Sequence, residues 1–162
     1  MRKARCLFAL ALLAAIAVTA TPAPPPENPV LQVNGGGTGL FIDPSVTPTD
    51  MGLFTNFGVG LVMYSDGSAT GHFTCMIPGI VVVDGLYDSA SYDPDTGIVT
   101  ASGIAREVFP QFDPIIVEFT TTFQAGGPGV GVFTLSDSSG YFPNYPDDVD
   151  TEVVIKGGIR IR

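Results

Sequence analysis

The chain has 162 residues, the length of one domain of ordinary size. Hydrophobic residues make up 45% and charged residues 14% of it, which excludes a disordered chain and allows a packed core. The formal net charge of −9 makes nucleic acid and anionic membrane surfaces unfavourable partners, because both are negatively charged.

The first twenty residues have the features of a secretory signal peptide. Arg2, Lys3 and Arg5 form a positive segment, and the uncharged apolar stretch 7–18 follows it. This stretch is shorter than the roughly 20 residues that an uncleaved membrane anchor needs. Small residues at 18–20 favour cleavage after Ala20. We therefore expect a secreted protein, extracellular or periplasmic.

Cleavage would leave a Pro-rich linker over 21–29 and a single β-domain over 30–162. The mature chain would carry four basic and sixteen acidic residues, a net charge of −12. Cys6 would leave with the signal peptide, so Cys75 remains alone and no intramolecular disulfide is expected.

Alternation of apolar and polar residues predicts strands that have one buried and one exposed face. Three segments show this alternation most clearly. The residues predicted to face inward are Phe57, Val59, Leu61 and Met63 in the first, Val117, Phe119 and Phe123 in the second, and Val153, Ile155, Ile159 and Ile161 in the third.

Turn residues separate these apolar runs. Asp66-Gly67, the segment 93–97 and the segment 125–129 each predict a tight connection between neighbouring antiparallel strands. The last strand is expected to close the sheet against the first near 40–42. The predicted fold class is all-β: a small antiparallel β-barrel or β-sandwich of about eight strands. The pattern leaves these two architectures open.

A set of glycine-rich motifs resembles a known family. The motifs are Gly35-Gly36-Gly37, Gly127-Pro128-Gly129, Phe133-Thr134-Leu135-Ser136, Gly140-Tyr141 and Gly157-Gly158-Ile159-Arg160-Ile161. In this order and spacing they are similar to the secreted bacterial post-COAP-type β-domain. The resemblance implies a small exported β-module, often attached to larger surface proteins, with no established enzymatic role and no catalytic residues to carry over.

Nucleophilic or zinc chemistry has little support in this sequence. His72 is the single histidine, and strand alternation places it on the face opposite Cys75. Cys75 is expected to be a buried, inert side chain. One His and one Cys fall short of a zinc site, and the absence of Trp weakens both the glycosidase and the lectin interpretations.

An acidic segment is the candidate metal site. Asp147, Asp148, Asp150 and Glu152 supply the carboxylate oxygens that calcium prefers. No recognised calcium-binding spacing is present, so a solvated acidic loop is the competing interpretation. No other cofactor is expected.

Three aromatic residues in the same loop, Tyr141, Phe142 and Tyr145, are candidate contacts for a partner. The alternative is that they pack as a lid over one end of a barrel, as the similar segment 109–114 would.

The leading hypothesis is an exported, non-enzymatic β-module with a structural or interaction role at the cell envelope or outside the cell, whose partner is an unidentified protein or glycan. The alternatives are a β-barrel binding protein for a small apolar ligand or glycan, and a calcium-stabilised surface domain. Oligomeric state does not follow from the sequence.

Overall fold

The computed structural model describes residues 28–42, 54–139 and 150–162. The predicted signal peptide and nearly all of the predicted linker lie outside these residues. The described chain forms eight strands: β1 (Pro29–Ile42), β2 (Phe54–Tyr64), β3 (Ala69–Ile77), β4 (Val81–Asp93), β5 (Ile98–Val108), β6 (Ile115–Gln124), β7 (Val132–Asp137) and β8 (Asp150–Ile161).

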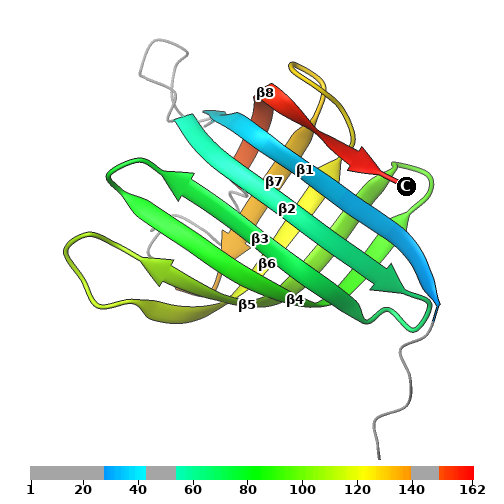
Figure 1. The fold of residues 1–162 in the computed structure, drawn as a ribbon, viewed down its shortest axis with the longest axis horizontal. Coiled ribbons are helices and arrows are strands. Elements are labelled where there is room, and N and C mark those ends of the chain that lie inside the picture. The colour runs from blue at the N-terminus through cyan, green and yellow to red at the C-terminus, as the bar shows by residue number, and fades with distance from the viewer. Residues whose placement is uncertain (1–27, 43–53, 140–149) are drawn as a thin grey trace, which may run out of the picture.

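The strands form one closed antiparallel barrel in which each strand pairs with its neighbours in sequence (Figure 1). β1, β2 and β3 cross the front of the ring in that view, and β6 and β7 pass behind it. The predicted all-β fold is confirmed. Of the two architectures that the sequence left open, barrel and sandwich, the structure has the barrel. No helix occurs among the described residues.

Pairing of β1 with β8 closes the ring, as expected. Leu40 lies opposite Val153 near one end of this pair. Near the other end, Gln32 and Arg162 exchange backbone hydrogen bonds of 2.8 and 3.0 Å. The first and last strands are therefore joined along almost their whole length.

Glycine allows the closest approach in this seam. Gly157 has a φ of 91°, and a Cβ atom on it would overlap the carbonyl oxygen of Gly36 on β1. A side chain at Gly157 would thus face both backbone strain and a steric clash. The glycine-rich motifs at the two ends of the sequence meet here.

Aromatic side chains fill the interior of the barrel. Phe73 is fully buried, and its ring centroid lies 6.2 Å from that of Phe119 and 6.1 Å from those of Phe123 and Phe133. Phe57 packs on Phe133 with a centroid separation of 4.5 Å. Rings from β2, β3, β6 and β7 thus meet in one cluster, and each such pair adds about 0.5–1.5 kcal/mol beyond its burial.

One polar pair lies within this core. The Tyr87 hydroxyl is 2.9 Å from Oγ1 of Thr121, and both residues are buried. Burial raises the pKa of Tyr87, so its hydroxyl stays protonated and satisfied by the threonine.

The predicted inward faces of β2 and β6 are confirmed, but that of β8 is wrong in its first half. Val154 and Glu152 are fully buried, whereas Val153 and Ile155 are turned outward. A β-bulge causes the difference: the register on β1 shifts between Thr38 and Gly39, and Ile155 has no partner there. Ile159, beyond the bulge, faces inward as predicted.

The predicted turns are present. Gly67 and Gly97 have φ values of 83° and 72°, in the region that glycine adopts at low cost. Asp93 accepts hydrogen bonds from the backbone nitrogen of Asp95 and the hydroxyl of Thr96, and these bonds lower the pKa of Asp93.

The antiparallel order gives the barrel two distinct ends. We call one the hairpin end: it holds the β2–β3, β4–β5 and β6–β7 connections. The other, here called the loop end, holds the β3–β4 turn and the segment 109–114. There Phe109 is buried in the core, whereas Phe112 is 59% exposed. The Phe112 ring meets that of Phe109 edge-on, with their centroids 6.4 Å apart.

Candidate functional site

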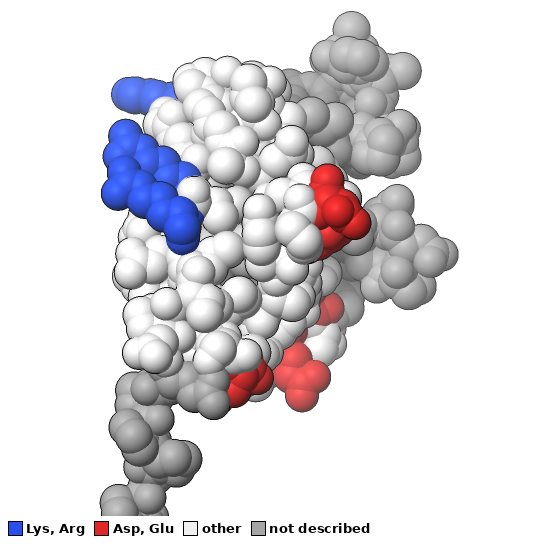
Figure 2. All heavy atoms as spheres, turned by 90° about the vertical axis from the view of Figure 1, so that its right-hand side faces the viewer, with Lys and Arg blue, Asp and Glu red and all other residues white. Residues whose placement is uncertain are grey.

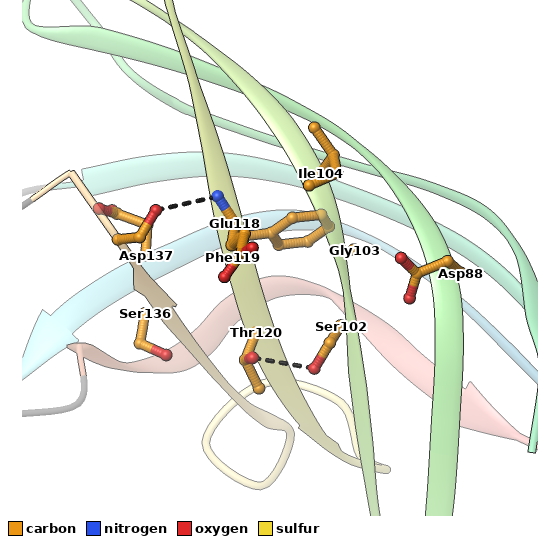
Figure 3. Close-up of a pocket in the computed structure, with 10 residues that line it drawn as sticks. Asp88, Ser102, Gly103, Ile104, Glu118, Phe119, Thr120, Ser136 and Asp137 are labelled. Carbon is orange, nitrogen blue, oxygen red and sulfur yellow. Dashed lines mark hydrogen bonds between the residues drawn. The ribbon is translucent and has the colours of Figure 1, made fainter.

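A hollow of about 460 Å³ lies on the outer face of the sheet, across β4 to β7 (Figure 3). Strand alternation turns most of its lining side chains to solvent. The lining residues are Asp88, Ser102, Gly103, Ile104, Glu118, Phe119, Thr120, Ser136, Asp137 and Ser138.

A β-bulge shapes one side of this hollow. The register between β4 and β5 shifts between Tyr87 and Ser89, so Asp88 has no partner residue on β5. Such a bulge bends the strand and increases its twist. In Figure 3, Asp88 on β4 and Asp137 on β7 lie at opposite sides of the hollow.

Hydrogen bonds fix the polar groups between these sides. Ser102 and Thr120 lie directly opposite each other on β5 and β6, and their hydroxyl oxygens are 2.9 Å apart. The backbone nitrogen of Glu118 donates to the hydroxyl of Ser138 over 3.0 Å. The hollow therefore presents ordered hydroxyl groups beside carboxylates.

The lining carries negative charge and no basic side chain. Asp88 and Glu118 are both exposed, and hydroxyl groups supply most of the other polar atoms. Carboxylates accept hydrogen bonds strongly, and hydroxyls both donate and accept them. This arrangement suits a neutral, hydroxyl-rich ligand or a cationic group, and it repels anions.

Basic side chains lie elsewhere on the surface. Lys156 and Arg160 are exposed on β8, and Arg162, directly after its end, is exposed as well. Figure 2 views the side on which the C-terminus lies, and basic side chains gather there along one edge while acidic side chains occupy the opposite edge. On this face the two kinds of charge lie apart (Figure 2), whereas on β4 and β5 the exposed residues Asp84 and Arg106 lie directly opposite each other.

Two glutamates face the interior near the loop end. Glu152 on β8 accepts hydrogen bonds from the Thr55 hydroxyl and, over 3.7 Å, from the Cys75 thiol. Glu107 on β5 is also fully buried, but neither of its carboxyl oxygens has a hydrogen-bond partner. Burial, with the carboxylate of Asp137 nearby, raises the pKa of Glu107 to about 7.

The structure separates the two residues weighed for nucleophilic chemistry. Cys75 is buried in the core, and His72, on the same strand, has the opposite orientation, as predicted. Glu152 rather than His72 is the polar neighbour of the thiol. The Cys75–His72 pair is therefore not assembled in this fold.

Most of the acidic and aromatic loop residues predicted as sites lie outside the residues that the structure describes. Asp147 and Asp148 lie outside the described residues, as do the aromatic candidates Tyr141, Phe142 and Tyr145. For Asp150 the described structure gives the strand position but not the side chain. Glu152 lies inside the barrel, where it contacts Thr55 and Cys75.

Sequence reasoning missed both the outer hollow and Glu107. A signal for Glu107 was present, because Val99, Ala101 and Ala105 share its parity on β5 and are buried. Extending that alternation by two residues places a carboxyl group inside the barrel. The hollow has no comparable signal, since it depends on a bulge and on the curvature of four strands.

The fold and these sites define a closed, eight-stranded antiparallel barrel with a filled interior and a polar outer hollow. Comparisons with family models, with curated proteins and with solved structures found no significant match to this chain. Across the described part of the chain, no three His, Cys, Asp or Glu side chains gather closely enough to hold a metal ion. The same residues include no helix long and apolar enough to span a membrane.

Proposed function

We propose that the protein is an exported, non-enzymatic β-module with a structural or interaction role at the cell envelope or outside the cell. The observation that carries this proposal is the filled interior, in which Phe73 contacts three further phenylalanine rings. A barrel that carries an apolar ligand needs an internal cavity of a few hundred Å³. Packed rings occupy that space here, which favours a rigid scaffold over a carrier.

The role agrees with what the resemblance to post-COAP-type β-domains implies, namely a small exported module with no established enzymatic role. The apolar N-terminal segment and the high negative charge after its removal also support it. The partner would then be a protein or a glycan bound on the outer surface.

The second candidate is a binding protein for a glycan, and the outer hollow favours it. Ser102, Thr120 and Ser136 line the hollow with hydroxyl groups, and the carboxylates of Asp88 and Glu118 are strong acceptors for sugar hydroxyls. An apolar ligand has little support, because Ile104 is the one aliphatic side chain in the lining.

A binding experiment with hollow variants tests both candidates. Purified protein is sedimented with insoluble envelope material from the producing cells, and neutral glycans released from that material are titrated calorimetrically. Loss of two strong acceptors in Asp88→Asn/Glu118→Gln should weaken binding at least about tenfold, since a hydrogen bond to a charged group contributes about 1.5–3 kcal/mol. Asp84→Asn is the matched control, because Asp84 is an exposed carboxylate that lies on β4 like Asp88 but outside the hollow.

The outcomes separate the candidates. Binding to envelope material that is insensitive to the hollow variant, with no binding of released glycans, supports the module and removes the glycan candidate. Mass spectrometry of the recovered glycans addresses enzymatic activity. Covalent change of a glycan at a rate proportional to protein concentration would defeat the non-enzymatic proposal.

A further inference from the structure

Outward side chains on β4 and β5 follow one another in a matched order. The outer face of β4 carries, from the loop end inward, Val82, Asp84 and Leu86. Directly opposite them on β5 lie Val108, Arg106 and Ile104. Each cross-strand pair therefore joins either two apolar side chains or two opposite charges. We call these six residues the β4–β5 face.

The apolar part of the β4–β5 face is open to solvent. Leu86 is 70% exposed and its cross-strand neighbour Ile104 is 48% exposed. Ile116, opposite Arg106 on β6, is 69% exposed and extends the apolar surface in that direction. Single exposed apolar residues are ordinary, but neighbouring ones on adjacent strands form a contiguous patch, which is typical of an interaction surface.

The two charges of the face remain available to a second molecule. The hydroxyl of Thr74 donates to Oδ1 of Asp84 over 3.3 Å, which holds this carboxylate on the outer surface. Arg106 is exposed beside it, and no ion pair joins the two side chains within the described part of the chain. An ion pair formed against another protein is screened less by water than one on an open surface.

We propose that the β4–β5 face pairs with the same face of a second copy of this chain, in a dimer with twofold symmetry. An axis parallel to the strands, running between β4 and β5, sets β4 of one copy against β5 of the other at the same level. Asp84 then meets Arg106 of the second copy, and Leu86 meets Ile104 of the second copy. Symmetry makes each of these contacts twice.

Self-complementarity favours a second copy over an unrelated partner. A foreign protein would need acidic, basic and apolar groups at the same spacing, whereas every copy of this chain carries them already. The match depends on the observed register: a shift of two residues between β4 and β5 would set Asp84 opposite Val108 or Ile104 instead of Arg106. Charge complementarity between copies would then be lost.

The convex shape of the barrel limits the dimer interface to a narrow strip. β3 and β6 curve away on either side, because the sheet closes into a ring. Interfaces below about 1,200 Å² are weak and reversible, so we expect a Kd on the order of 10⁻⁵–10⁻⁴ M. The β4–β5 face shares only Ile104 with the lining of the outer hollow. Ligand binding in the hollow can therefore be measured on the monomer, at lower protein concentration.

Sedimentation velocity of the purified protein, from about 5 µM to about 1 mM, tests the proposal. The wild type should change from monomer to dimer over this range. Asp84→Arg and Arg106→Asp each place like charges at both contacts, and each should raise the Kd at least about tenfold. Asp95→Arg makes the same change of charge in the β4–β5 turn, outside the face, and should dimerise like the wild type.

Two combinations of these variants test the twofold arrangement itself. Asp84→Arg/Arg106→Asp exchanges the two charges and should restore the dimer. Its net charge equals that of the wild type, so a general change in repulsion would not explain the recovery. An equimolar mixture of the two single variants should also dimerise, because every contact in the mixed pair again joins opposite charges.

Thermal unfolding at low protein concentration checks that each variant is folded. All the substituted side chains are exposed, so the Tm should stay within about 3 °C of the wild type. Three results would overturn the proposal: a wild type that stays monomeric at about 1 mM, a folded single variant that dimerises as tightly as the wild type, or a folded double variant that stays monomeric. None of them bears on export.

Discussion

The inward-facing carboxyl of Glu107 couples the folded state to pH. Its pKa is raised from the ordinary value of 4.5 to about 7, mainly because burial disfavours the charged form. The folded chain therefore holds more protons than the unfolded chain between these two values. Stability must then fall as pH rises from about 4.5 through 7, because the slope follows the difference in bound protons.

We predict that Glu107→Gln removes this decline. The wild-type slope from Glu107 is at most about 1.4 kcal/mol per pH unit, since one proton is involved. The variant should match the wild type below pH 4.5 and exceed it increasingly up to pH 7. Urea unfolding at a series of pH values measures the difference. Glu118→Gln, on the outer face, should keep the wild-type slope, and parallel curves for Glu107→Gln and wild type would contradict the assignment.

Glycine positions within strands divide into two kinds at the scale of the element. Gly157 on β8 has a positive φ, and its missing Cβ leaves room for the carbonyl of Gly36. Gly58 on β2 pairs with Gly36 from the other side, yet a Cβ on it would meet nothing within 4 Å. The close packing around Gly36 therefore requires glycine at position 157 but not at position 58.

The two alanine variants should accordingly differ in stability. Gly157→Ala is expected to cost at least about 2 kcal/mol, because it forces both a strained φ and a separation of β8 from β1. Gly58→Ala should change stability by less than about 1 kcal/mol, and toward greater stability, since alanine costs less entropy than glycine in a strand. Urea midpoints compare them directly. Similar losses in both variants would mean that the close contact in the seam is not what requires glycine.

Within elements, the sequence predicted the strands better than their faces. Regular alternation placed Phe57 and Phe119 in the core correctly, because no bulge interrupts the alternation there. In β8 the adjacent valines Val153 and Val154 are equally suited to the buried position. The bulge at Ile155 places Val154, rather than Val153, inside the barrel. A bulge is set by the pairing with β1, which a local pattern does not contain.

The barrel as a whole follows from turn chemistry and from closure of the last strand on the first. Both were visible in the sequence, because Gly67 and Gly97 mark hairpins and the final strand alternates strongly. The outer hollow was not visible, since residues from four strands meet there through curvature. Each strand contributes only common exposed polar residues to the hollow, and only the assembled sheet brings Asp88 and Glu118 to one place.

Export is the prediction that concerns the whole molecule. Expressed with its own N-terminus in a bacterium, the protein should be found outside the cytoplasm as a chain that begins at Thr21, because Ala20 completes the small-residue cleavage pattern. Fractionation followed by intact mass spectrometry identifies the mature N-terminus. Retention of the Met1 form in the cytosol would contradict the proposed location.

The closed ring also limits how a partner is recognised. Open sheets offer unpaired backbone groups along an edge, and many peptides bind by hydrogen-bonding there as an additional strand. Each of the eight strands here already has a neighbour on both sides. Strand addition to the barrel is therefore restricted to places where this pairing ends, as the pairing of β8 with β7 does beyond Val153. Elsewhere selectivity must come from outward side chains and from the connections at the two ends. The same arrangement protects an exported protein from edge-to-edge aggregation with its own copies.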